Sequence, residues 1–186
     1  TVNYNGLRDT CEMIDSFRNH ETYPHYEIIV VDNGSRLPEA EEIQERYRGN
    51  LVPGGSLSGS PASDNPVPFP PVKVVRNINN GFAGGNNAGL KTAGGDYLFF
   101  INNDTLIKEP VLEALVRRME CDPQRNGGVS PMLKFAACPD ILQYAGFTPL
   151  SSLTLRNASI GFMQQDGPRF RTPCETASLH GAAMMV

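Results

Sequence analysis

Two amides and a carboxylate, Asn102, Asn103 and Asp104, directly follow the apolar residues 97–101. Such a short apolar run is typical of a buried strand in a parallel sheet, and ligands bind at the carboxyl ends of these strands. One carboxylate with neighbouring amide oxygens can hold a hard divalent cation together with phosphate oxygens. An Asx turn that closes the strand accounts for the same residues equally well. Asp104 is therefore a candidate metal ligand that needs support from other parts of the chain.

The glycine-rich residues 81–89 follow a predicted short strand over residues 72–75 and open a predicted helix. In that position, backbone N–H groups point toward a bound anion. The glycines do not form the G-x-G-x-x-G pattern of dinucleotide-binding folds, and a tight turn would also explain them. The segment also contains polar side chains that a simple turn does not need, namely Asn80, Asn86 and Asn87. These asparagines favour contact with a phosphate or a sugar.

Polar residues also end the first two predicted strands. Asp32 follows the strand-like residues 27–31, where its carboxylate could accept hydrogen bonds from a ribose or from a base N–H; helix capping or an Asx turn is the alternative. Tyr4 could stack on a base, although a single tyrosine is more often part of a core. Because four successive predicted strands end in polar clusters, the sequence predicts one cleft that collects them.

The elements that must position these residues alternate between strands and helices along the first two thirds of the chain. Periodicity and turn signals predict helices over 7–19, 38–48, 86–93 and 110–120. They predict four strands, the end of one over 1–3 and others over 27–31, 72–75 and 97–101. Residues 50–71 are rich in Pro, Gly and Ser and predict a long irregular loop. Short strand-like pieces follow, over 129–135 and 141–147. The predicted fold class is α/β, with a mostly parallel sheet flanked by helices and a smaller mixed or antiparallel part.

Length and composition fit one globular domain over residues 1–186. A net charge of -4 without a basic stripe argues against nucleic-acid binding. No apolar run reaches the ~18 residues of a membrane span. The four cysteines are far apart and form no C-x-x-C pair, so reduced thiols in the cytosol are the simplest interpretation.

The ordered motifs together resemble the family 2 inverting glycosyltransferases of the GT-A fold, and in particular their rhamnosyltransferase-like branch, which acts on bacterial surface polysaccharides. The residues that carry the resemblance are NYNG at 3–6, VVDNGS at 30–35, NGFAGGNNAG at 80–89 and FINNDT at 100–105. The resemblance is strong over residues 1–120. It is looser beyond them, through 143–146 and 180–184. The resemblance implies that residues 1–120 form a nucleotide-sugar-binding half, which includes the irregular loop, and that residues 121–186 form an incomplete acceptor-side half.

The resemblance implies a nucleotide-diphosphate sugar as donor, UDP- or dTDP-linked, and a glycan or lipid-linked acceptor. Mg²⁺ or Mn²⁺ would bind Asp104, with Asn102 in the place of the first acid of a D-x-D motif. The implied nucleotide-sugar contacts are Val2, Tyr4, Asp32, Asn80, Gly81, Gly85, Asn86 and Asn103. The general base, an Asp or Glu, is expected beyond Val186, so this chain should bind a donor better than it turns it over. The expected location is the cytoplasm, including the inner face of the membrane.

Two other functions are compatible with parts of the pattern. A sugar-phosphate nucleotidyltransferase also carries carboxylates at strand ends, but it needs a glycine-rich loop with Arg or Lys where this chain has residues 3–6. A non-catalytic nucleotide-sugar or carbohydrate-binding module is the second alternative. His180 could face an acceptor, although a partly buried histidine with a backbone partner is the favoured interpretation.

Overall fold

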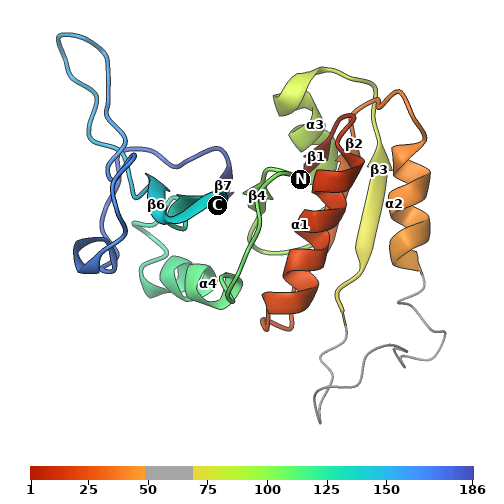
Figure 1. The fold of residues 1–186 in the computed structure, drawn as a ribbon, viewed down its shortest axis with the longest axis horizontal. Helices are drawn as coiled ribbons and strands as arrows, with labels where there is room; N and C mark the ends of the chain where they lie inside the picture. Colours follow the sequence, from red (N-terminus) through yellow and green to blue (C-terminus); the bar gives the residue numbers. More distant parts are fainter. Residues whose placement is uncertain (49–68) are drawn as a thin grey trace. The chain divides into compact units, whose positions relative to one another are not determined.

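The computed structural model describes residues 1–48 and 69–186 (Figure 1). They form two compact units, Thr1–Glu113 and Ala114–Val186. Most of the irregular loop predicted over residues 50–71 lies outside the described residues. None of the described helices is both long enough and apolar enough to cross a membrane.

The first unit is built on a three-stranded parallel sheet in the order β1-β2-β3. The strands are β1 (Val2–Asn3), β2 (Ile28–Asp32) and β3 (Val72–Arg76). Val31 lies opposite Val2 on one side of β2, and also opposite Val75 on the other side. The predicted strands over 27–31 and 72–75 are confirmed within one residue at each end.

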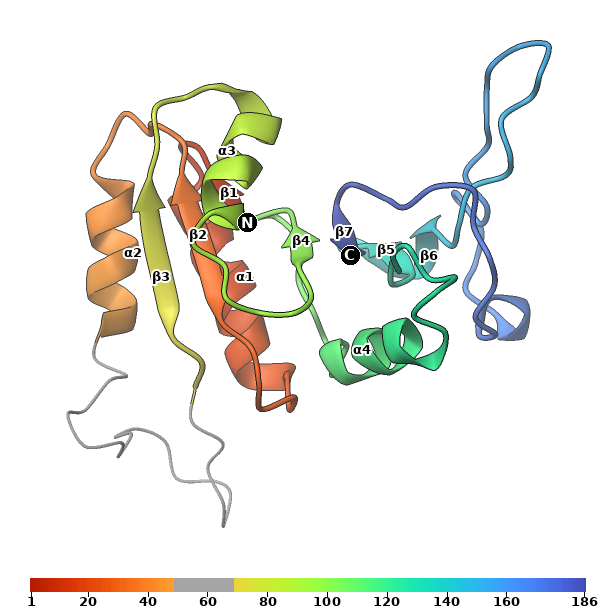
Figure 2. The ribbon, with the colours of Figure 1, turned by 180° about the vertical axis from the view of Figure 1, so that it is seen from behind.

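Helices cover both faces of this sheet. The helices α1 (Leu7–His20) and α2 (Glu39–Arg48) lie on one face, and α3 (Gly81–Leu90) lies on the other, across β1 and β2 (Figure 2). Successive side chains of β2 point to opposite faces of the sheet. Ile29 and Val31 point toward Gly89 of α3, while Val30 is fully buried on the opposite side. Apolar residues at helical spacing along α1, including Ile14 and Phe17, pack into the core as predicted.

The prediction for α3 was wrong about where the helix begins. Residues 81–85, expected to be a loop before a helix at residue 86, already form the first turns of the helix. The reason is close packing: a Cβ at Gly85 would lie 2.9 Å from Val2 Cγ1, and a Cβ at Gly89 would lie 3.0 Å from Val31 Cγ2. Glycine therefore lets the helix backbone approach the sheet, and this contact holds a sequence of low helix propensity in a helix.

The last strand of the first unit, β4 (Phe99–Ile101), is shorter than the apolar run that predicted it. Helix α4 (Leu112–Cys121) follows and begins two residues after Pro110. The Glu21 carboxylate accepts hydrogen bonds from the backbone N–H groups of Val111 and Leu112, at 2.9 and 3.0 Å. A carboxylate at this position satisfies donors at the start of α4 that have no partner within the helix.

The second unit contains the predicted smaller antiparallel part. Strands β5 (Leu133–Phe135) and β6 (Cys138–Tyr144) pair in antiparallel fashion, and β7 (Ala183–Met185) bridges to Val129. Residues 147–159 form a hairpin closed by a bridge between Phe147 and Ser159. Leu142 and Tyr144 of β6 are buried at the centre of this unit. The mixed α/β class predicted from the sequence is confirmed.

Candidate donor-binding edge

The carboxyl ends of β1, β2 and β3 lie at one edge and are joined by backbone hydrogen bonds. Asn33 N–H donates to Asn3 O at 2.8 Å, which ties the loop after β2 to the end of β1. Asn77 N–H donates to Asp32 O at 2.8 Å and ties the loop after β3 to the same place. The structure thus brings these strand ends together, as parallel pairing requires.

A buried polar cluster lies beneath this edge, with Asn3 at its centre. The Asn3 side chain is 0% exposed, and its Nδ2 donates to Asp32 Oδ1 at 3.1 Å and to Glu39 Oε2 at 2.8 Å. It also lies 3.2 Å from Ser35 Oγ, which in turn donates to Asp32 Oδ1. Glu39 accepts a second hydrogen bond, from Gly6 N–H at 3.1 Å. Each buried carboxylate therefore has donors that offset its desolvation.

Asp32, a predicted nucleotide contact, is part of this cluster. Only 7% of the residue is exposed, and its Oδ1 is held by Asn3 and Ser35. Its contacts in the structure orient the loop after β2, so any ligand contact would add to a structural role. Tyr4, by contrast, is 48% exposed above the cluster. The next residue, Asn5, is in the left-handed region with φ 52°. Its N–H donates to Ser35 Oγ at 3.0 Å, and this bond fixes the loop that carries Tyr4.

The other predicted donor contacts lie on or beside α3. Val2 and Gly85 face each other in the β1–α3 contact, and Gly85 is buried. Gly81 is exposed with φ 85°, and its carbonyl accepts from Asn33 Nδ2 at 3.2 Å. Asn80 is exposed at the start of the helix, whereas Asn86 is half-buried and donates to Phe82 O, one turn earlier in the same helix, at 3.1 Å. The exposed start of α3 is thus the part of this segment that offers backbone N–H groups to an anion.

The predicted metal residues lie in the turn that follows β4. Thr105 N–H donates to Asn102 O at 3.1 Å and closes the turn, and Asp104 is exposed on it. Asn102 Oδ1 is buried without a hydrogen-bond partner among the described residues. Asn103 points back into the unit, where its Nδ2 donates to Thr10 Oγ1 at 3.1 Å. The turn is therefore attached to the same edge as the ends of β1, β2 and β3.

Three residues of this edge were missed by sequence reasoning: Asn3, Thr10 and Glu39. Asn3 did carry a signal, because asparagine is unusual inside a strand and its burial requires partners. Thr10 and Glu39 carry little signal of their own. Thr10 sits on a helix face and Glu39 in a helix first turn, where both residue types are ordinary.

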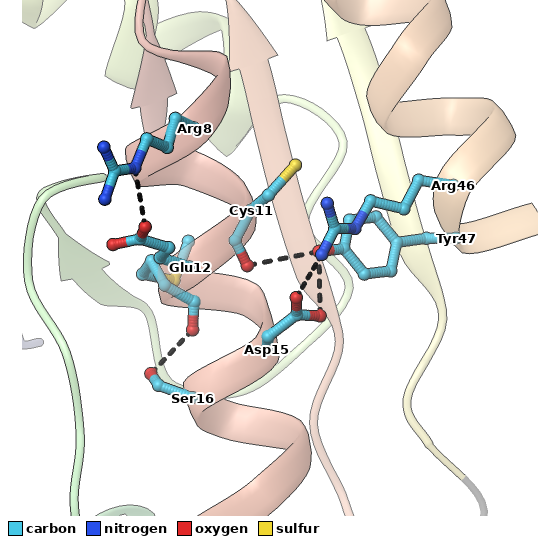
Figure 3. Close-up of polar contacts among 8 residues, drawn as sticks. Arg8, Cys11, Glu12, Asp15, Ser16, Arg46 and Tyr47 are labelled. Atoms are coloured by element: carbon cyan, nitrogen blue, oxygen red, sulfur yellow. Dashed lines mark hydrogen bonds and ion pairs between the residues drawn. The ribbon is translucent and has the colours of Figure 1, made fainter.

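A groove of about 670 Å³ lies elsewhere on the first unit, along α1 and α2. It is lined by Leu7, Arg8, Cys11, Glu12, Glu42, Glu45 and Arg46. Figure 3 shows the polar contacts beside it: Arg8 pairs with Glu12 at 2.8 Å, and the Tyr47 hydroxyl donates to Cys11 O at 3.2 Å. Burial raises the pKa of the Cys11 thiol, which keeps it protonated. None of the predicted site residues lines this groove. The hydrogen bond between Tyr47 and Cys11 joins α2 to α1, whereas the Arg8–Glu12 pair lies within α1.

His180, in the second unit, has the environment that the sequence favoured. Its Nδ1 accepts from Ala182 N–H at 3.1 Å, and its ring is stacked on Phe147 with an interplanar angle of 5°. Burial lowers the pKa of the imidazole. The ring is therefore a neutral packing element with a backbone partner, and we assign it no chemistry.

A parallel sheet with helices on both faces and polar loops at one edge defines an α/β fold suited to binding nucleotides. Residues 1–126 match the family model described as glycosyl transferase family 2, and because this is more than half of the chain, the protein belongs to that family. Both the family and the GT-A fold inferred from the sequence motifs are thereby confirmed. A search of curated protein sequences gives no match.

Two solved structures are similar to this chain, and the first of them supports the fold. Residues 1–349 of TarS from S. aureus share 19% sequence identity with this chain, with a TM-score of 0.55, over 83% of this chain and 41% of that one. A further structure of S. aureus TarS shares 21% identity with a TM-score of 0.48, over 71% of this chain and 20% of that one. The chain thus spans less than half the length of these proteins. At this level of identity, the first similarity establishes the shared fold.

Proposed function

We propose that this chain supplies the donor-binding part of a metal-dependent glycosyltransferase, which moves a sugar from a nucleotide-diphosphate donor to a glycan or lipid-linked acceptor. The observation that carries the proposal is the single edge at which Tyr4, Asp32, the start of α3 and the Asp104 turn come together. Membership of glycosyl transferase family 2 supports it. An inverting reaction, hexosyl or rhamnosyl transfer, a UDP- or dTDP-linked donor and a cytoplasmic location belong to the same proposal.

The residues of the turn after β4 suit Mg²⁺ or Mn²⁺. Asp104 offers an exposed carboxylate, and Asn102 offers a buried amide oxygen without a partner among the described residues. Hard divalent cations prefer such oxygen ligands. The described residues contain no group of three or more His, Cys, Asp or Glu side chains that could hold a metal ion. Phosphate oxygens of the donor and water would therefore complete the coordination.

Other residues of the chain would bind the base and the diphosphate of the donor. The half-exposed Tyr4 ring offers a face for stacking on a base, and the first turn of α3 offers backbone N–H groups to the diphosphate. When bound at Asp104, a divalent cation neutralises charge that develops on the leaving diphosphate. Attack by an acceptor hydroxyl also requires a general base, and we assign none of the described residues to that role.

Calorimetric titration with UDP and with dTDP, each with and without Mn²⁺, tests the proposal. The cation should raise the affinity for one of the nucleotides by about tenfold or more, because Asp104 would hold a positive charge that attracts the diphosphate. Asp104→Ala should remove this gain while leaving metal-free binding unchanged.

Asp96→Ala is the matched control, because Asp96 is an exposed carboxylate that precedes the same strand. This variant should keep the full metal-dependent gain. Failure of the unmodified chain to bind either nucleotide with Mn²⁺ would reject the proposal. An unchanged gain in Asp104→Ala would reject the metal-ligand role of Asp104.

A further inference from the structure

A continuous chain of side-chain hydrogen bonds crosses the first unit from the turn after β4 to the loop after β2. Asn103 Nδ2 donates to Thr10 Oγ1 at 3.1 Å, and Thr10 Oγ1 donates to Asn3 Oδ1 at 2.8 Å. Asn3 Nδ2 then donates to Asp32 Oδ1 at 3.1 Å. The Thr10 hydroxyl is the central member, because it accepts from one side and donates to the other.

The central members of this chain are fully enclosed. Thr10 and Asn3 are each 0% exposed, so water does not compete for their hydrogen bonds. In such surroundings a missing partner leaves a buried polar atom unsatisfied, which makes the geometry of the chain strongly preferred. The position of Thr10 is itself set by the start of α1, where its N–H donates to Gly6 O at 2.9 Å.

A second contact fixes the turn after β4 at the same place. A Cβ at Gly6 would lie 2.7 Å from Asn103 Nδ2, so the Asn103 amide passes directly over the loop after β1. Only glycine leaves room for this approach. The side chain of Asn103 is thus held between Gly6 and the Thr10 hydroxyl, one residue before Asp104.

We propose that Thr10 is a positioning residue that couples the nucleotide-facing cluster to the metal-bearing turn. The proposal rests on the function proposed above and extends it to a residue that touches neither donor nor cation. The Thr10 hydroxyl holds Asn103, and through it Asp104, in register with Asp32 and Tyr4. A diphosphate that reaches from the base-binding loop to the cation needs this register.

Loss of the hydroxyl has a specific consequence under this proposal. Asn103 Nδ2 and Asn3 Oδ1 each lose a partner, whereas the contacts of Asn3 Nδ2 with Asp32 and Glu39 stay in place. The nucleotide-facing cluster is therefore kept, and the Asp104 turn loses its attachment. The metal-dependent part of donor affinity should fall, while the metal-free part should not.

Thr10→Val and Thr10→Ser form the matched pair for the test. Valine keeps the shape and removes the hydroxyl, whereas serine keeps the hydroxyl. The gain in UDP or dTDP affinity that Mn²⁺ provides should fall about tenfold in Thr10→Val and stay within about threefold in Thr10→Ser. Metal-free affinity should stay within about threefold in both. An altered fold would instead weaken both parts of the affinity.

Ser16→Ala controls for the loss of a buried hydroxyl from the same helix. Ser16 Oγ donates to Met13 O at 2.7 Å and accepts from Ile107 N–H at 3.2 Å, but it has no bond to Asn3 or Asn103. This variant should keep the full metal-dependent gain. If Thr10→Val does not fold, Thr10→Ala removes the same hydroxyl and should lower the gain in the same way.

A ligand-free measurement separates this inference from the proposed function. Hydrogen exchange at the Asn103 side-chain amide, followed by NMR, should be slow in the unmodified chain and in Thr10→Ser and faster in Thr10→Val. Unchanged exchange in Thr10→Val overturns the inference, whatever the nucleotide titrations show. An equal metal-dependent gain in Thr10→Val and the unmodified chain also overturns it. Absence of any gain in the unmodified chain, with the exchange pattern as expected, rejects the proposed function and with it the coupling to donor affinity.

Discussion

The strand-end edge of the first unit buries polar side chains, whereas the 147–159 hairpin of the second unit exposes apolar ones. At the edge, the polar side chains of Asn3 and Thr10 are completely buried. In the hairpin, the apolar side chains of Leu153 and Leu155 are 90% and 76% exposed. The hairpin keeps its shape through backbone bonds such as Thr148 N–H to Ala158 O at 3.0 Å. Side-chain identity should therefore matter greatly at the edge and little in the hairpin.

Replacement of an asparagine by leucine in each region should give the largest difference in stability. Asn3→Leu leaves the buried carboxylates of Asp32 and Glu39 without their shared donor, and it should lower the free energy of unfolding by about 4 kcal/mol. Asn157→Leu, in the exposed hairpin, should change it by less than about 0.5 kcal/mol. Urea denaturation followed by circular dichroism measures both values. Similar losses for the two variants would contradict the contrast between the regions.

A second pair of variants tests whether the second unit has a core of its own. Leu142 is 0% exposed in β6, so Leu142→Ala should cost about 3 kcal/mol through lost burial and a cavity. Leu153→Ala, at the exposed end of the hairpin, should cost less than about 0.5 kcal/mol. The same denaturation experiment compares them. A small loss in Leu142→Ala would show that this unit is loosely packed throughout.

The smallest expected effect is a pH dependence that belongs to the second unit. Because burial lowers the folded-state pKa of His180, the unfolded state binds the proton more readily, and stability should fall as pH drops below the ordinary value of about 6.5. His180→Asn keeps an acceptor for Ala182 N–H but does not titrate. The difference in unfolding temperature between the unmodified chain and His180→Asn should therefore change by about 1–2 °C between pH values of about 8 and 5.5. A constant difference across this range would show that His180 does not contribute.

The alternating elements of the first unit were predictable because each has a local cause. Strand β2 follows from its β-branched run, and α1 follows from its apolar periodicity. The start of α3 was not predictable, because the close approach of Gly85 to Val2 is a tertiary contact between residues far apart in sequence. For the same reason, Asp32 was identified as a candidate, while Glu39, which shares the Asn3 amide donor with it, was not. The polar cluster depends on which strand ends become neighbours, and this is decided by the topology of the sheet.

The glycines of α3 have a consequence for the order in which the chain folds. Glycine costs about 1 kcal/mol relative to alanine inside a helix, and a ten-residue helix is marginal on its own even with good helix formers. Residues 81–90 should therefore stay non-helical in the nascent chain until β1 and β2 provide a surface to pack against. The same dependence should make α3 unfold before α1 when that surface loosens. Hydrogen exchange should accordingly find the amides of α3 less protected than those of α1.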